Sequence, residues 1–248
     1  MEDGALPPPR FGVHGQVVGL EKVADNITAM QIAVEAPPLA FAPGQYVALT
    51  LPDQKPRDYS LSWRSTPFLL EFFVRDHKAG GASSFVARRL RVDDEVCFDG
   101  PFGTMTVDPI HQGPILCVAF STGIGPIASI AAAIADQQPE ADLHLYWGAA
   151  EAQELFLLDD IAAALPLNGQ LVLCAEDGDP ASGIIRPGSP LDAIKADFDT
   201  LDGWQAYAAG PPRMVEAAAP LLHSLGLTAD AFRADAFFTE QDKQKSPS

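Results

Sequence analysis

The chain has 248 residues, 47% of them hydrophobic, three cysteines and a formal net charge of −17. That acidity argues against binding to nucleic acid or to an anionic membrane, because either would require a basic face. No apolar run approaches the roughly 20 residues that span a bilayer, the N-terminus lacks the apolar core of a secretory signal, and three scattered cysteines form no disulfide framework. A cytoplasmic chain long enough for two domains is therefore expected.

Residues 1–10 are expected to be flexible, and residues 11–108 to form an antiparallel β-barrel. Short β-forming runs separated by turn residues are typical of such a barrel. The strands are predicted at residues 13–20, 27–34, 45–51, 58–62, 69–74 and 95–98, and one helix at residues 84–90. The glycine turn at residues 100–103 is expected to close the barrel without contacting a ligand.

Residues 57–60 combine a cation, a carboxylate, an aromatic ring and a hydroxyl on one predicted strand. Arg57 and Tyr59 should lie on one face and Asp58 and Ser60 on the other, because strand side chains alternate. A guanidinium suits a phosphate, a phenol can lie on a conjugated ring, and a serine can hydrogen-bond a ring nitrogen. The alternative interpretation is an ordinary strand with Tyr59 half-buried.

The second candidate site is a pair of glycines followed by small residues at a helix start, namely Gly80, Gly81, Ala82, Ser83 and Ser84. Backbone amides at a helix N-terminus can hold a phosphate, helped by the helix dipole. The alternative is a glycine turn in which one of the serines is an ordinary N-cap.

Residues 112–238 alternate between strand and helix patterns, which predicts a parallel sheet with helices on both faces. The strands are predicted at residues 114–119, 143–147, 170–174, 205–209 and 233–238, and the helices at residues 127–135, 155–165, 191–196 and 214–225. Residues 239–248 are expected to be flexible. The five histidines have no metal-ligand spacing, so no metal site is predicted.

Segments 57–62, 80–84, 100–103, 121–126 and 210–214 resemble, in this order, the motifs of the ferredoxin–NADP reductase superfamily. The resemblance covers residues 11–238 and implies FAD between a barrel and an α/β domain, with hydride passing from nicotinamide C4 to flavin N5. A pyrophosphate grip by residues 80–84 implies FAD, whereas a single phosphate would imply FMN. The chain is similar to the flavin reductase part of oxygenase electron-transfer components without the iron–sulfur domain, since it has no clustered set of four cysteines.

The resemblance also assigns roles to individual residues. It gives the hydrogen bond to flavin N5 to Ser60, ring packing to Tyr59, and a phosphate contact to Arg57, so that Ser60 and Tyr59 are the catalytic candidates. The other implied cofactor-binding residues are Asp58, Phe73, Val74, Arg75, Gly80, Gly81, Ala82, Ser83, Ser84, Thr122, Gly123, Gly148, Gly210, Pro211 and Phe237. Ser121 and Ala209 depart from the family, which has a glycine and a cysteine there, and Ala209 leaves no thiol beside the nicotinamide.

The loops at residues 149–154 and 175–179 are acidic or apolar, where NADPH-using members of the family offer Ser, Arg or Lys to the extra phosphate. NADH is therefore the expected donor, because a carboxylate repels that phosphate and accepts hydrogen bonds from ribose. The implied acceptor is a separate ferredoxin or oxygenase. The alternatives are a reductase that uses flavin as a diffusible substrate and a non-catalytic sensor or docking subunit.

Overall fold

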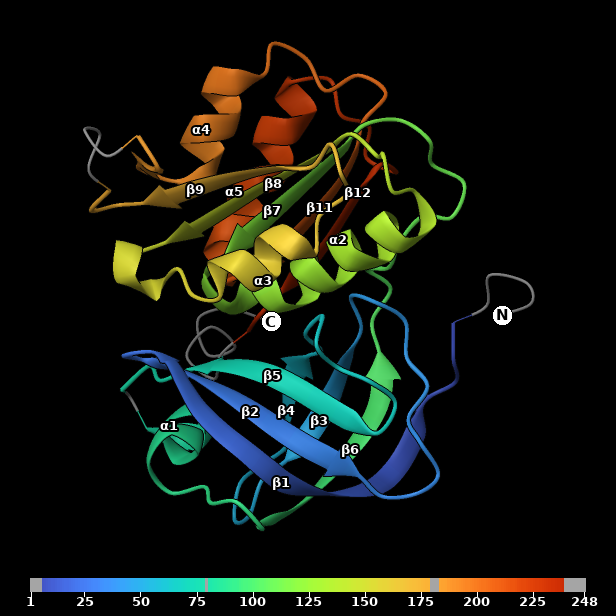
Figure 1. Cartoon of the computed structure of the whole chain (residues 1–248), viewed down its shortest axis with the longest axis vertical. Helices are drawn as coiled ribbons and strands as arrows, with labels where there is room; N and C mark the ends of the chain where they lie inside the picture. Colours follow the sequence, from blue (N-terminus) through green and yellow to red (C-terminus); the bar gives the residue numbers. More distant parts are fainter. Residues whose placement is uncertain (1–5, 79, 179–182, 239–248) are drawn as a thin grey trace, which may run out of the picture.

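The computed structural model describes residues 6–78, 80–178 and 183–238, which form two six-stranded sheets. In Figure 1 the first sheet, coloured blue to green, lies below the second, coloured green to red. We call the part from β1 to β6 the barrel half and the part from β7 to β12 the α/β half. An antiparallel half followed by a parallel α/β half confirms the predicted fold class.

The barrel half is an antiparallel sheet with strand order β4-β3-β6-β1-β2-β5. Its elements are β1 (Arg10–Ala24), β2 (Ile27–Val34), β3 (Tyr46–Thr50), β4 (Arg57–Ser60), β5 (Leu69–Arg75), α1 (Gly81–Arg88) and β6 (Glu95–Phe102). The strand with the Arg-x-Tyr-Ser motif, β4, lies at one end of this order and pairs with β3, with Tyr59 opposite Val47. Its side chains therefore lie at the margin of the sheet.

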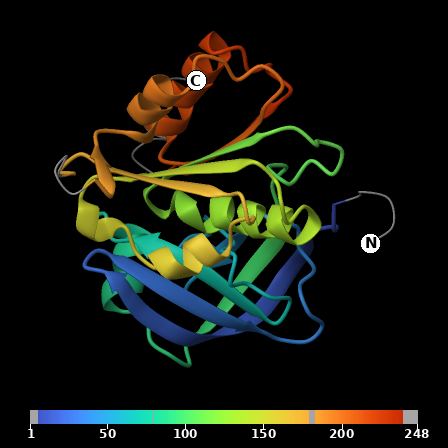
Figure 2. The same ribbon diagram turned by 45° about the horizontal axis from the view of Figure 1, so that its top comes forward.

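The α/β half is a parallel sheet with strand order β10-β9-β8-β7-β11-β12. Its elements are β7 (Ile115–Phe120), η2 (Ser121–Gly123), α2 (Ile124–Gln137), β8 (Leu143–Ala149), η3 (Ala152–Glu154), α3 (Leu158–Ala163), β9 (Gln170–Ala175), β10 (Ile185–Pro187), α4 (Pro190–Asp197), β11 (Gln205–Gly210), α5 (Pro212–Ser224) and β12 (Phe232–Ala236). Helices α2 and α3 lie between the two sheets, and α4 and α5 cover the opposite face (Figures 1 and 2). Nowhere in the described ranges is a helix long and apolar enough to cross a bilayer.

Several elements differ from the prediction. In the barrel half, β6 continues to Phe102 through most of the turn predicted at residues 100–103, and in the α/β half the short 3-10 helices η2 and η3 were not predicted. Of the helix predicted at residues 155–165, the structure forms only the shorter α3. Its N-terminus is set by Leu157, which adopts a left-handed conformation with φ 51° and so cannot be part of the helix. Strand β10 was not predicted, since its three residues are too few to show an alternating pattern.

Strands β2 and β5 supply side chains to two different cores. Met30 and Phe72 pack inside the barrel half, whereas Ile27, Ala29 and Phe73 belong to the hydrophobic cluster of the α/β half. Strand side chains alternate between faces, so a strand that is buried on both faces reads as a nearly continuous apolar run. The two halves therefore meet over an apolar surface, and the outward face of β5 is part of it.

Candidate functional site

A cleft of about 1520 Å³ lies between the two halves. The barrel half contributes β4, the end of β5 and the loop before α1, and the α/β half contributes η2, η3, the start of α5 and the end of β12. Most small-molecule sites have volumes of roughly 300–1,000 Å³. This cleft is therefore large enough for two nucleotides side by side.

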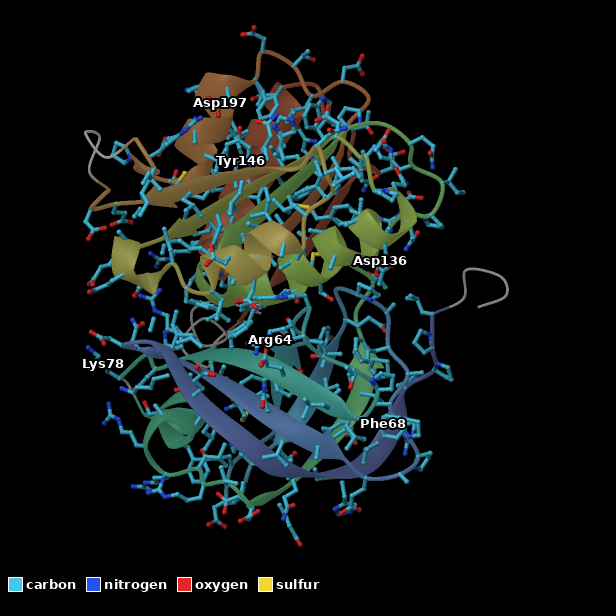
Figure 3. The ribbon with its side chains drawn as sticks, in the orientation of Figure 1. Arg64, Phe68, Lys78, Asp136, Tyr146 and Asp197 are labelled. Carbon is cyan, nitrogen blue, oxygen red and sulfur yellow. The ribbon has the colours of Figure 1, made fainter. Side chains whose placement is uncertain are left out.

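Most of the site residues predicted from the sequence line this cleft. They are Arg57, Asp58, Tyr59, Ser60, Phe73, Val74, Arg75, Gly80, Gly81, Ala82, Ser83, Thr122, Pro211 and Phe237. Ser84, Gly123, Gly148 and Gly210 are not among its lining residues. Lys78, at the left of the barrel half in Figure 3, lines the cleft, whereas exposed Phe68 lies at the other side of that half.

Strand β4 brings Tyr59 and Ser60 to the cleft. The Tyr59 ring meets Phe72 edge-on, with ring centroids 6.0 Å apart, and its burial raises the pKa of the phenol to about 12. The Ser60 hydroxyl donates to Asp235 Oδ2 at 2.8 Å. Burial raises the pKa of Asp235, and the charge of Asp58 adds to this, although the Ser60 hydrogen bond lowers it. The site thus joins a serine of the barrel half to a carboxyl group of the α/β half.

The loop before α1 is held by Asp76. Its carboxylate accepts from Ser84 Oγ at 2.6 Å, from Lys78 N at 2.8 Å and from Arg88 Nη2 at 3.2 Å. The Ser84 hydrogen bond, followed by those from Lys78 and Arg88, outweighs desolvation and lowers the pKa of Asp76. The Ser84 hydroxyl is therefore used to shape the loop, and Ser83 is the serine that lines the cleft.

The glycines of this loop fit a phosphate-binding role. Gly80 and Gly81 have φ of +83° and +77°, and a Cβ on either would have no neighbour within 4 Å. No described side chain caps the N-terminus of α1, and uncapped amides in a first helical turn suit an anion. Together with Arg57, which lines the same cleft, these donors have the chemistry that a flavin pyrophosphate requires.

The predicted glycines of the α/β half are buried against neighbouring segments. A Cβ on Gly123 would lie 2.1 Å from the Ala209 carbonyl oxygen, and one on Gly148 would lie 2.3 Å from Pro190 Cδ. A Cβ on Gly210 would lie 2.6 Å from the Phe120 carbonyl oxygen. The close approach of neighbouring backbone at Gly123 and Gly210, and of the Pro190 ring at Gly148, explains these glycines without a ligand.

Arg75 lines the cleft and links the two halves. Its guanidinium donates to Ser121 Oγ at 3.0 Å and to Glu154 Oε1 at 2.5 Å, both in the α/β half. Glu154 also accepts from Asn26 Nδ2 at 2.7 Å. Asn26, Ser121 and Glu154 all line the cleft.

The residues that sequence reasoning missed come from loops without a recognisable motif. Asn26 and Glu154 are single polar residues far apart in the chain, and no local pattern indicates that they meet. Met214, at the start of α5, lines the cleft and also packs partly against the α/β core. Asp235, within the strand predicted at residues 233–238, also lines the cleft, and a single carboxyl group in a strand forms no motif.

Comparisons with known proteins agree with this geometry. The family described as an oxidoreductase FAD-binding domain matches residues 14–107, and the one described as an oxidoreductase NAD-binding domain matches residues 118–219. The chain is 33% identical over 239 residues to a protein from Ralstonia, the ferredoxin–NAD(P)+ reductase component of naphthalene 1,2-dioxygenase/salicylate 5-hydroxylase systems. The alignment covers 95% of this chain and 72% of that protein. It is 30% identical over 240 residues to the corresponding naphthalene 1,2-dioxygenase component of Pseudomonas putida, with 95% and 72% coverage.

Solved structures show the same fold. A cytochrome P450 reductase of Amycolatopsis superposes with a TM-score of 0.83 and 28% identity, over 93% of this chain and 70% of that one. The ferredoxin reductase in carbazole 1,9a-dioxygenase has a TM-score of 0.83 and 24% identity, over 94% of this chain and 70% of that one. At the lower identity the likeness concerns the fold alone.

Proposed function

The chain belongs to the family of FAD- and NAD-binding reductase components of oxygenase systems, and on that premise we propose that it passes electrons from NADH to a separate ferredoxin or oxygenase component. It is an NAD(P)H-dependent oxidoreductase with an FAD-binding and an NAD-binding half. When bound, FAD supplies the conversion of a hydride into single electrons, which side chains cannot perform. The observation that best supports the proposal is the cleft itself, because it joins the β4 motif to the carboxyl ends of parallel strands.

The residues of the barrel half would hold and orient the flavin. Tyr59 offers a neutral ring face, Arg57 and the amides at Gly80 to Ser83 offer donors for phosphate, and Ser60 offers a hydroxyl beside the ring. The Ser60–Asp235 hydrogen bond keeps that hydroxyl in one orientation. The Asp235 carboxyl group, whose pKa burial raises, lies beside that hydroxyl in the cleft wall.

The preference for NADH rests on carboxylates at the edge of the α/β sheet. Glu151 lines the cleft, and Asp177 Oδ1 accepts from Ala152 N at 2.7 Å, which ties the loop after β9 to η3. A phosphate on the ribose of NADPH would be repelled by these charges. We expect Glu151→Gln to improve kcat/KM for NADPH about two- to fivefold, since an exposed charge contributes roughly 1 kcal/mol or less.

The control for that comparison is Asp136→Asn, which removes an exposed carboxylate on α2 away from the cleft (Figure 3). It should leave the NADH-to-NADPH ratio unchanged. An equal change in both variants would mean that net charge alone sets the ratio, and NADPH preferred by the parent would contradict the proposal.

The decisive experiment is an anaerobic NADH titration of the purified protein, followed by flavin absorbance. A yellow protein that bleaches with NADH and regains colour on adding an oxidised ferredoxin is the expected result. Colourless protein that oxidises NADH only with added flavin would favour the diffusible-flavin alternative. Bound flavin that stays oxidised would favour a sensor or docking subunit.

The proposed compartment is the cytoplasm. The three cysteines are free thiols, and burial raises the pKa of Cys117 and that of Cys174 above the ordinary thiol value. Neutral buried thiols are poor nucleophiles. They therefore suit a reducing compartment and take no part in the proposed reaction.

A further inference from the structure

Glu154 is a buried carboxylate whose hydrogen-bond partners come from both halves. Its side chain is 4% exposed. It accepts from Arg75 Nη2 at 2.5 Å and Asn26 Nδ2 at 2.7 Å in the barrel half, and from Ala150 N at 3.3 Å in its own half. A buried charge is costly unless it is paired and hydrogen-bonded. The position of Glu154 is therefore tied to the position of both barrel partners.

Arg75 connects the same two halves at a second point. While one guanidinium nitrogen binds Glu154, the other donates to Ser121 Oγ at 3.0 Å. The planar fork of arginine fixes the relative directions of two such bonds. One side chain of β5 thus holds both η2 and η3 in place. We call Arg75, Ser121, Glu154 and Asn26 the interdomain bridge.

The anchors of this bridge are themselves firmly placed. Ser121 has φ of 54°, and its carbonyl accepts from the buried Trp147 Nε1 at 2.9 Å. On the other side, Phe73 of β5 packs on Phe156 with ring centroids 4.8 Å apart, and a Cβ on Gly125 would lie 3.3 Å from it. Neither Ser121 nor β5 can move without disturbing these contacts. The bridge therefore fixes the position of one sheet relative to the other.

The bridge also lies where the reacting groups would meet. Phe73, Val74 and Arg75 line the barrel wall of the cleft, while Ser121 and Thr122 line the wall opposite. Thr122 follows directly on the bridged serine. A change in the bridge would therefore alter the distance between the two walls at this point.

We propose that Arg75 and Glu154 are positioning residues that set the distance between the flavin wall and the nicotinamide wall of the cleft. The proposal rests on the function proposed above. Neither residue takes part in the chemistry, and their effect acts through the placement of η2 against β5. A misplacement of about 1 Å in such a site can cost a hundredfold in rate.

The test uses Glu154→Gln and Arg75→Lys in the full chain. Glutamine keeps the size of Glu154 and removes its charge, and lysine keeps the charge of Arg75 and loses the fork. The control is Asp197→Asn, which removes the negative charge from the Arg186–Asp197 ion pair of 2.6 Å and weakens the hydrogen bond from Tyr146, on the far side of the second sheet (Figure 3).

Three quantities are measured for each variant: FAD content, the rate constant of flavin reduction at saturating NADH, and amide hydrogen exchange in β5 and η2. We expect both bridge variants to keep the FAD content of the parent, to lose about tenfold in the reduction rate, and to exchange faster in both segments. The control should match the parent in all three.

Unchanged exchange and an unchanged reduction rate in Glu154→Gln would overturn the proposal. So would a loss of FAD that accounts for the whole loss of rate, because the residues would then only retain the cofactor. If the parent itself is not reduced by NADH, the proposed function fails, whereas the exchange measurement still decides whether the bridge couples β5 to η2.

Discussion

The two walls of the cleft use their motif residues in opposite ways. In the barrel half, Tyr59 and Gly80 lie at the cleft, and the space around Gly80 is open. In the α/β half, Gly123 and Gly148 face the backbone and a proline of neighbouring segments at contact distance. A motif glycine can thus leave room for a ligand or for another part of the protein. The two cases are distinguished by whether a Cβ added at the glycine would meet protein atoms. Alanine substitutions test this, through the loss of stability in one case and the loss of cofactor in the other.

The largest effect is expected for Gly123→Ala. The added Cβ would lie 2.1 Å from a backbone oxygen, so strand β11 or η2 has to move. We expect a loss of about 3 kcal/mol or more in the free energy of unfolding, measured with urea. Gly203→Ala is the comparison variant, since a Cβ there meets nothing within 4 Å and its φ of +77° should cost only about 1–2 kcal/mol of backbone strain. Equal losses in the two variants would show that close packing does not explain Gly123.

A smaller effect, on binding, is expected for Arg57→Ala. Loss of a charge-assisted hydrogen bond costs about 1.5–3 kcal/mol, which corresponds to a 10- to 100-fold weaker affinity for FAD. The measurement is the fluorescence of FAD released on dilution. Arg89→Ala, an exposed arginine outside the cleft lining, should retain FAD like the parent. Full retention in Arg57→Ala would remove this residue from the site.

Gly80→Ala tests the role of the glycine that has open space around it, in the loop before α1. Gly80 has φ of 83° and ψ of −166°, a conformation that only glycine adopts readily, so alanine should cost about 1–2 kcal/mol through backbone strain. The loop should move, and FAD retention should fall with it. Gly12→Ala shares the positive φ and the open surroundings but lies outside the cleft. It should lose stability without losing FAD, and a parallel loss in both would contradict a specific role for the loop.

The smallest effect is expected for Asp235→Asn, and it depends on pH. Burial raises the pKa of Asp235 above its ordinary value of 3.8. Its contribution to stability is therefore complete below that value and is lost as the pH rises through the raised pKa. The variant should gain relative to the parent by no more than about 1 kcal/mol, and more at pH 7 than at pH 4. Thermal unfolding at both pH values measures this difference in stability. A larger gain in stability at pH 4 than at pH 7 would contradict a raised pKa of Asp235.

The sequence predicted the fold well where local pattern and packing agree. The apolar run at residues 114–119 and the alanine-rich helix after it appear as β7 and α2, because both are buried on nearly all sides. Helix α3 was predicted too long, since nothing local reveals the left-handed Leu157. Propensity alone does not place such single-residue breaks.

The candidate site was predicted where one short segment carries it. Residues 57–60 all line the cleft, and their cofactor-binding roles stay a prediction. The bridge was not predictable, because Asn26, Arg75 and Glu154 are brought together only when the two halves pack. Arg75 was assigned to the cofactor wall on its position in the chain, whereas its partners come from the tertiary structure.

The two-faced strands β2 and β5 have a consequence for folding. Ile27, Ala29 and Phe73 pack in one cluster with residues of the α/β half, so each half removes apolar surface of the other from water. Either half expressed alone would expose that surface and tend to aggregate. The intact chain should accordingly melt as one cooperative unit, and loss of order in one half should bring down the other.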